Sequence, residues 1–403
     1  MKITNARAIH FGSRPNITFL ELETDTGLIG LGETYYTPRT AAMFMEEVLI
    51  PMLLDSDPLQ IEGYWRRVYD ATHVYGNKGI EMRALAAVDV ALWDILGQHL
   101  GQPIWQLLGG SIHPEGVLIY NTCASDGYAQ GTPGVWRKDR PQPSKLHDDF
   151  AAWNKDAGTL AKSLLKMGIR CMKIWPFDPM ALVNRGQTIS WPEIERGLLP
   201  FKQIRDRVGM EMDIILEGHG YWSLAPARRI AEALEPFKLV LLEDVMKPDH
   251  PRTLAKLRES TRTPICASEL LMNRYAVEQL IEAGACDVVM ADPAWAGGIS
   301  ECRRIANLAE VHNMGVIFHD CTGPVTLAAG LHLGTHAPNT WMQEIVRAYT
   351  LGFYRDIVTP SLEIQNGRMK PPAAPGLGVR IPDKARKRPD YTARSLIQRE
   401  DKP

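Results

Sequence analysis

The stretch MDIILEGHG (212–220) decides the fold together with its two successors along the chain, LVLLEDV (239–245) and ICASEL (265–270). Each is a short apolar run that ends in a glutamate: Glu217, Glu243 or Glu269. The three glutamates follow one another at equal intervals, about the length of one strand, one helix and their turns. The pattern predicts consecutive strands of a parallel sheet, with the three acids side by side at one edge.

Similar runs extend the pattern on both sides. Between them lie segments that are apolar at helical spacing, such as PARRIAEALEPF (226–237) and NRYAVEQLIEAGAC (273–286). Eight strands joined by helices close on themselves, so we predict an α/β fold, a modified TIM-type (β/α) barrel over residues 116–355. The eight expected strands are Val117 to Thr122, Cys171 to Trp175, Met212 to Gly218, Leu239 to Asp244, Pro264 to Glu269, Asp287 to Asp292, Gly315 to Asp320 and Trp341 to Glu344.

Residues 1–115 have a different pattern and are expected to form an N-terminal α+β capping domain. Two or three strands, with Gly27, Gly30 and Gly32 at turns, precede helices such as MRALAAVDVALWDILGQHL (82–100). Residues from about 356 to 403 are expected to return to this domain, with a solvated terminus after about 380. The Gly- and Pro-rich segment 127–145 is expected to be an irregular loop after the first barrel strand.

The composition is that of an ordinary globular protein. The chain has 403 residues, 45% hydrophobic content and a formal charge of −2, which gives no field for attracting nucleic acid or an anionic membrane surface. No apolar run is long enough to cross a bilayer and the start does not resemble a signal peptide, so a cytoplasmic location is expected. The six cysteines are far apart without a CxxC pair, which indicates free and mostly buried thiols.

Three carboxylates that converge at one edge need a cation, because they cannot all stay ionised next to one another without one. Hard oxygen ligands in this number suit Mg²⁺, which keeps its other positions for water or substrate. We therefore predict a Mg²⁺ site formed by Glu217, Glu243 and Glu269.

Two histidines lie where they could transfer protons at this edge. His219 is two residues after Glu217, so both side chains of an extended strand would point the same way. His319 ends the seventh run (GVIFHD) and Asp292 ends the sixth (VVMAD), so Asp292 can accept the imidazole Nδ1–H and raise the basicity of Nε2. Glu344 ends the eighth run, where it could hydrogen-bond an enolate oxygen if protonated; an ion pair with Arg347 is the alternative.

With these residues in place, the sequence resembles the mandelate racemase-like subgroup of the enolase superfamily over nearly its full length. The resemblance also rests on ALWDILGQHLGQPIWQLLGG (91–110) and PGLGVRIPD (375–383). Within the subgroup the chain looks most like acid-sugar dehydratases of the galactonate and mannonate type. The resemblance implies three metal ligands (Glu217, Glu243 and Glu269), a base dyad (Asp292 and His319), an acid that releases the β-hydroxyl (His219) and a strand-eight acid (Glu344).

The sequence departs from the family pattern at several positions. The first metal ligand is usually Asp, and Glu217 is one methylene longer. Racemases and lactonising enzymes of the superfamily have Lys-x-Lys on the second barrel strand, whereas this chain has Lys173, Ile174 and Trp175. Trp175 cannot transfer a proton. Lys173 could neutralise the substrate carboxylate or form a structural salt bridge.

The expected activity is that of a lyase, a Mg²⁺-dependent dehydratase of an aldonate or aldarate. It would remove the α-proton and the 3-hydroxyl to give a 2-keto-3-deoxy acid. Candidate contacts to the substrate are Tyr36, Arg39, Tyr75 and Trp175. An epimerase or racemase that uses both histidines as bases is one alternative, and a sensing or regulatory paralogue with weak turnover is another. The expected partner is a small sugar acid, and a homo-oligomer between a dimer and an octamer is expected.

Overall fold

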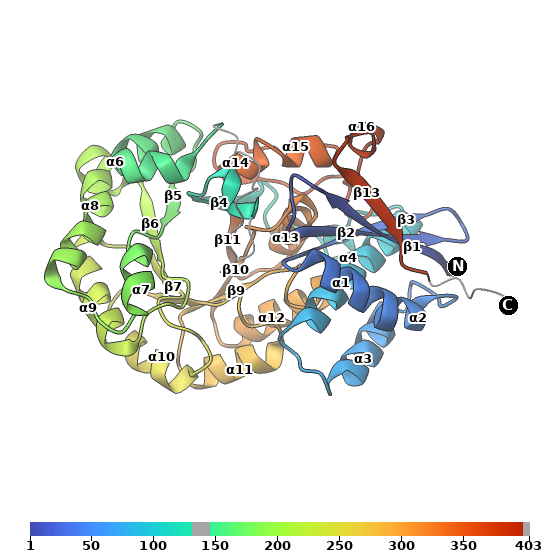
Figure 1. Cartoon of the computed structure of the whole chain (residues 1–403), viewed down its shortest axis with the longest axis horizontal. Coiled ribbons are helices and arrows are strands. Elements are labelled where there is room, and N and C mark those ends of the chain that lie inside the picture. Colours follow the sequence, from blue (N-terminus) through green and yellow to red (C-terminus); the bar gives the residue numbers. More distant parts are fainter. Residues whose placement is uncertain (131–145, 398–403) are drawn as a thin grey trace.

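The computed structural model describes residues 1–130 and 146–397, which form a barrel next to a smaller cap (Figure 1). The barrel is a closed sheet of eight parallel strands, since the last strand, β11, pairs with the first, β4. All eight strands predicted from the sequence are present. They are β4 (Val117–Thr122), β5 (Cys171–Ile174), β6 (Asp213–Glu217), β7 (Leu241–Glu243), β8 (Ile265–Ala267), β9 (Val288–Ala291), β10 (Gly315–Phe318) and β11 (Thr340–Ile345).

Helices follow the strands and surround the barrel (Figure 1). The main ones are α6 (Asp149–Leu165), α7 (Asp178–Asn184), α8 (Trp191–Val208), α9 (Leu224–Leu234), α10 (Pro251–Arg258), α11 (Arg274–Glu282), α12 (Gly298–Val311) and α13 (Pro324–His336). Shorter ones are η2 (Asp126–Gln130), η3 (Gly209–Glu211), η4 (Glu235–Phe237), α14 (Arg347–Thr350), α15 (Tyr354–Ile357) and α16 (Asp383–Arg386). A two-residue strand, β12 (Arg368–Met369), pairs antiparallel with β4.

The alternation of side chains along each strand explains how the acids reach the barrel mouth. Ile214 and Leu216 belong to the large core under the helices, whereas Ile215 belongs to a separate core formed by the barrel strands. Because side chains two residues apart share a face, Glu217 continues the inward-facing row of Ile215 at the carboxyl end of β6. In such barrels this end of the sheet carries the active site.

The cap consists of an antiparallel sheet and the helices that cover it. The sheet order is β13 (Tyr391–Ser395), β1 (Ile3–Phe11), β2 (Ile17–Thr24) and β3 (Ile29–Tyr35). The helices are α1 (Pro38–Phe44), η1 (Met45–Leu49), α2 (Ile50–Leu53), α3 (Ile61–Thr72), α4 (Ile80–Leu100) and α5 (Ile104–Leu108). The fold class predicted from the sequence, a barrel with an N-terminal cap, is thus confirmed.

Two glycines lie elsewhere than predicted. Gly27 lies in a turn with φ +83°, but Gly30 and Gly32 lie inside β3 and not at turns. Helix α4 crosses this strand so closely that a Cβ on Gly32 would lie 1.9 Å from the carbonyl oxygen of Ala87. The glycines are therefore needed for the packing of helix on strand.

The expectations for two irregular segments need correction. Residues 391–395 are not a solvated tail, because they form β13 and pair with β1 at the edge of the cap sheet. The segment expected as a loop over 127–145 begins with part of the short 3₁₀ helix η2. Its remainder, 131–145, lies outside the described residues.

Buried hydrogen bonds fix the cap over the loops that follow the barrel strands. Glu33 on β3 accepts backbone N–H groups of Val325 and Thr326 in the first turn of α13, and burial raises its pKa to about 7. The indole of Trp65 on α3 donates to the carbonyl of Gly297, just before α12. In the described part of the chain, no helix combines the length and apolarity that a membrane span requires.

Candidate functional site

The three predicted metal ligands lie buried at the mouth of the barrel. Glu217 and Glu243 are directly opposite each other in the register of β6 and β7, but Glu243 is opposite Cys266 on β8. Glu269 therefore lies three residues further along the chain than the position level with Glu243. The three glutamates are equally spaced in the sequence, but they do not lie at the same level along the barrel axis. Glu269 lies in the loop after β8 and reaches the site from there.

A fourth acid, Asp244, joins this group. It accepts a hydrogen bond of 2.5 Å from the hydroxyl of Ser268, and burial and the nearby Glu269 and Glu217 raise its pKa well above the usual range. Burial also raises the pKa of Glu243 and Glu269. One buried carboxylate oxygen of Glu243, of Asp244 and of Glu269 has no hydrogen-bond partner in the described chain. These free oxygens are hard ligands, so the group fits a cation such as Mg²⁺.

Lys173, from β5, lies among these carboxylates. Its ammonium group forms ion pairs with Glu217 (3.3 Å), with Glu344 (2.9 Å) and with Glu243. The lysine is buried, yet its pKa is raised well above the usual value because the surrounding acids outweigh the effect of burial. The salt-bridge alternative for Lys173 is therefore present in the structure, at the centre of the site.

His319 has the orientation expected for a base dyad. Its Nδ1 lies 2.6 Å from an Asp292 oxygen, and Asp292 is held by the backbone N–H of Ala294 and the hydroxyl of Thr322. The Nδ1–H donates to the carboxylate, so Nε2 is left to face the site. Burial lowers the pKa of His319, but Glu344, Asp292 and Glu269 outweigh it and raise the value to about 9.

Glu344 lies beside this histidine and differs from one expectation. Arg347 pairs with Asp149 and leaves Glu344 to contact Lys173, Thr122 and, at 3.5 Å, Nε2 of His319. Burial opposes ionisation of Glu344, but Lys173 and His319 outweigh it and lower the pKa to about 2. The ion pair between Glu344 and Arg347, which was the alternative, is therefore not formed. The hydrogen bond from Glu344 to an enolate stays a prediction.

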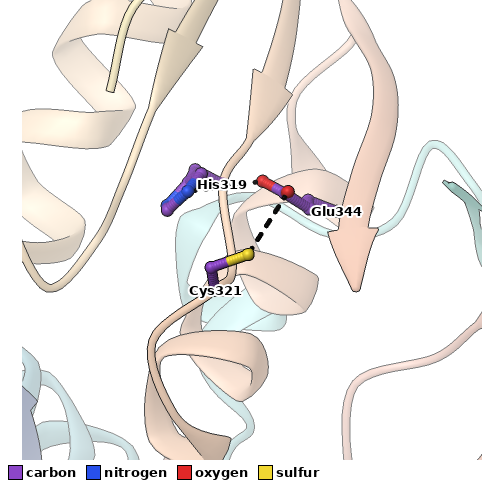
Figure 2. A group of neighbouring side chains, drawn as sticks. All are labelled: His319, Cys321 and Glu344. Carbon is purple, nitrogen blue, oxygen red and sulfur yellow. Dashed lines mark hydrogen bonds and ion pairs between the residues drawn. The ribbon is translucent and has the colours of Figure 1, made fainter. Parts of the chain in front are cut away.

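Cys321 was not predicted as a site residue. It follows β10, and Figure 2 shows its sulfur directed toward Glu344, with His319 beside them. The sulfur lies 3.7 Å from a Glu344 oxygen. The ligand atoms of His319, Cys321 and Glu344 lie within 4.8 Å of one another, so they could also hold an ion. Burial raises the pKa of the Cys321 thiol well above its usual value, and a neutral thiol is a poor ligand. The glutamates are the better cation site.

His219, at the opposite side of the barrel from His319, belongs to a second dyad. Its Nδ1 lies 2.7 Å from Asp178, in the first turn of α7, and its Nε2 lies 3.0 Å from the hydroxyl of Tyr128 on η2. Burial lowers the pKa of His219, but Asp178 and Glu217 outweigh it and raise the value to about 9. The sequence reading missed Asp178 and Tyr128, because neither ends a barrel strand.

The four predicted substrate contacts do not lie together. Trp175 is buried in an aromatic wall with Tyr128 (ring centroids 5.6 Å apart) and His219 (5.8 Å). Tyr36 lies between cap and barrel, 5.6 Å from the ring of Trp295. Tyr75 is 65% exposed and packs on Phe44, and Arg39 is exposed beside a surface hollow with His10 and Asp390. Neither Tyr75 nor Arg39 contacts the residues described above.

Comparisons with known proteins agree with this architecture. Residues 5–109 match the mandelate racemase/muconate lactonizing enzyme N-terminal domain, and residues 156–385 match the enolase C-terminal domain-like family. The chain is 30% identical to the arabinonate dehydratase of Saccharolobus solfataricus over 91% of its length and 88% of the relative. It is 30% identical to the D-mannonate dehydratase of Xanthomonas oryzae pv. oryzicola over 98% and 93%.

Solved structures show the same relationship. An enolase of the mandelate racemase subgroup from Agrobacterium tumefaciens is 38% identical, with a TM-score of 0.86 and 98% of each chain covered. Both domains of the family are thus matched in order, and the match of 156–385 alone spans more than half of the chain. The chain therefore belongs to the enolase superfamily, with the domain pair of the mandelate racemase/muconate lactonizing enzyme family.

Proposed function

We propose that this protein is a Mg²⁺-dependent dehydratase of a sugar acid, which gives a 2-keto-3-deoxy acid. The observation that carries the proposal is the pair of histidine–carboxylate dyads on opposite sides of the barrel mouth. His319 pairs with Asp292 at 2.6 Å, and His219 pairs with Asp178 at 2.7 Å. Two held imidazoles with the carboxylates between them suit a reaction that removes a proton at one carbon and a hydroxyl at the next. Named relatives that are dehydratases of arabinonate and mannonate support the same chemistry.

Membership of the enolase superfamily implies a divalent metal. Glu217, Glu243 and Glu269 would hold it, because they offer buried carboxylate oxygens, two of which have no other partner in the described chain. When bound, a divalent cation supplies Lewis acid stabilisation of the negative charge that develops on the substrate carboxylate. Lys173 adds a second positive charge beside Glu243 and Glu344.

The α-proton is assigned to His319. With its Nδ1–H donated to Asp292, the imidazole accepts the C2 proton at Nε2, and the electron pair of the C2–H bond moves into the enediolate. His319 must be neutral to accept this proton. The acids around it raise its pKa to about 9 and so favour the protonated form. A divalent cation beside Glu269 would counter that effect and lower the pKa.

The leaving hydroxyl is assigned to His219. Its Nε2, held toward the site by the bond from Nδ1 to Asp178, protonates the 3-hydroxyl as the C3–O bond breaks and water leaves. A double bond forms between C2 and C3, and the resulting enol takes up a proton at C3 to become the 2-keto-3-deoxy product. The hydroxyl of Tyr128, 3.0 Å from Nε2, lies where we expect the leaving group.

The substrate class, the cellular location and the oligomeric state are further parts of the proposal. We infer that the substrate is an aldonate or aldarate that contacts the ring of Trp175 and that of Tyr36. A cytoplasmic location and assembly as a homo-oligomer, from dimer to octamer, remain predictions that fractionation and light scattering can test.

A screen of sugar acids tests the proposal. The protein is incubated with a library of aldonic and aldaric acids, with Mg²⁺ or with EDTA, and 2-keto acids are measured as semicarbazones. We expect product from a small stereochemical set, only with Mg²⁺. Glu243→Gln should lose Mg²⁺ binding by calorimetry as well as turnover. Product that forms equally in EDTA, or unchanged Mg²⁺ affinity in Glu243→Gln, would contradict the assignment of the metal site.

A further inference from the structure

Arg83 lies between the cap and the barrel mouth, in the first turn of α4. It donates one hydrogen bond, of 3.1 Å, to the backbone carbonyl of Tyr35. Its guanidinium lies 4.1 Å from the ring centroid of Trp295 and 5.4 Å from that of Tyr36. Trp295 in turn lies 5.2 Å from the ring of His319. One indole therefore separates Arg83 from the proposed base.

Several features make this a costly place for a cation. The first turn of a helix carries the positive end of the helix dipole, which disfavours a positive side chain. Burial disfavours the charge further and lowers the pKa of Arg83 to about 10. Within residues 1–130 and 146–397, no carboxylate lies within ion-pair distance of Arg83; Asp292 and Glu269 act on it only from further away.

Other arginines of the same interface are paired. Arg304 stacks on Trp65 at 4.6 Å, much as Arg83 stacks on Trp295, but it also forms ion pairs with Glu62 and Glu301. An arginine that only holds the cap to the barrel can thus have acidic partners here. Arg83 has no acidic partner in the described residues, and its one hydrogen bond goes to the carbonyl of Tyr35. The other N–H groups of its guanidinium are therefore available to an anion that binds at the barrel mouth.

A donor beside Arg83 has no acceptor in the part of the chain that the structure describes. Trp295 is 5% exposed, and its indole Nε1 is buried with no hydrogen-bond partner in the described residues. A buried donor without a partner has a free-energy cost that a bound acceptor removes. Arg83 and Trp295 contact each other. In the described chain, an indole donor without a partner and a guanidinium without an acidic partner therefore lie together, beside the proposed base.

We propose that Arg83, with Trp295, binds the carboxylate at the far end of the substrate, so that the enzyme prefers aldarates, which carry two carboxylates, over aldonates. This inference rests on the proposed dehydration. A planar guanidinium can bind a carboxylate through two parallel N–H···O bonds, a geometry that a terminal hydroxymethyl group cannot match. In this arrangement the first carboxylate of the substrate would lie near Lys173 and the metal-binding glutamates. The second carboxylate would bind to Arg83 and Trp295, between the cap and the barrel mouth.

The test compares matched pairs of acids that differ only in whether C6 is a carboxylate or a hydroxymethyl group. For the wild type we expect kcat/KM to be at least tenfold higher for the aldarate. Arg83→Gln should lower kcat/KM for the aldarate by roughly 10- to 100-fold, mainly through KM, and change the aldonate by less than about threefold. Arg83→Lys keeps the positive charge but cannot form two parallel hydrogen bonds, so its kcat/KM for the aldarate should lie between those of the wild type and Arg83→Gln. If Arg83→Gln does not fold, Arg83→Lys takes its place in the test.

Arg304→Gln is the matched control, because it removes an arginine stacked on a tryptophan at the same interface. It should lower Tm and leave the aldarate preference unchanged. Equal turnover of both acids by the wild type, or equal loss for both acids in Arg83→Gln, would overturn the inference and leave Arg83 a structural residue. If no sugar acid is turned over, the proposed function fails by itself. In that case an aldarate that raises the Tm of the wild type with Mg²⁺, but not the Tm of Arg83→Gln, would still support the subsite. If the aldarate does not shift the Tm of the wild type, or shifts the Tm of both proteins equally, the subsite is contradicted.

Discussion

At the residue scale, the site contains two histidines that are each oriented by a carboxylate. A histidine has two ring nitrogens, and a carboxylate on Nδ1 determines that Nε2 is the one that meets the substrate. Asp292 does this for His319 and Asp178 does it for His219. The two imidazoles differ in their other neighbours, since His319 faces Glu344 whereas His219 faces the hydroxyl of Tyr128.

Removal of each histidine should stop a different step. His319→Asn should reduce both C2–H exchange with solvent deuterium and dehydration by a factor of about 10² to 10⁴, the usual loss for a general base. His219→Asn should reduce dehydration but keep slow exchange, because enolisation needs the base and the cation alone. Proton NMR of the C2–H signal in deuterated water measures exchange. Exchange that persists in His319→Asn and disappears in His219→Asn would reverse the two roles.

Asp178 should act only through His219. Asp178→Asn removes the negative charge that stabilises the protonated imidazole of His219 and leaves an amide in its place. We therefore expect kcat for dehydration to fall about 10- to 100-fold while C2–H exchange is kept. The double variant Asp178→Asn/His219→Asn should be no slower than His219→Asn alone, since the two changes affect one function. Losses that multiply in the double variant would show that Asp178 has a separate role.

At the element scale, the strands and their ends could be predicted from the sequence, but their heights could not. The alternation of short apolar runs with amphipathic helical segments was enough to find all eight barrel strands, and to place Asp292 and His319 at the ends of neighbouring strands. The relative height of Glu269 depends on how each connecting helix packs, which the spacing of acids does not encode. Asp178 was missed because it lies in α7, and Arg83 because it lies in α4, where a charged side chain has no pattern that marks it as functional.

The contact between α5, α13 and the C-terminal segment should make the fold sensitive to acid. His332 on α13 accepts a hydrogen bond from the backbone N–H of Trp105 and donates one to the carbonyl of Leu377. Burial lowers its pKa to about 4, so the folded protein holds this proton more weakly than the unfolded chain does. The stability from neutral His332 is therefore present above about pH 6.5 and is lost as the pH falls toward 4.

The size of this effect is on the order of 3 kcal/mol over the full range. Urea unfolding at pH 7 and pH 4.5 should show a steeper loss of unfolding free energy for the wild type than for His332→Gln. Gln keeps one donor and one acceptor but does not titrate. Equal losses in the two proteins would mean that His332 does not control the acid response.

At the scale of the whole molecule, the barrel supplies the reacting groups and the cap closes over them. Tyr36 and Arg83 reach the mouth from the cap, and Glu33 anchors the cap on α13, the helix that follows the loop with His319 and Cys321. The sequence indicated that the cap would contact the substrate but selected Arg39 and Tyr75, which are exposed. Aromatic and charged residues near the end of β3 look alike in the sequence, and only the packing of α4 distinguishes those that face the barrel.

The central claim is that one catalytic cycle removes the C2 proton and then the 3-hydroxyl. The most direct measurement is NMR of the wild type with Mg²⁺ and a sugar acid that it turns over, in deuterated water. We predict that the C2–H and C3–H signals of the substrate disappear together, and that a 2-keto-3-deoxy acid with one deuterium at C3 accumulates. Deuterium that enters C2 of an otherwise intact acid, with no keto acid formed, would contradict the account and identify an epimerase or racemase.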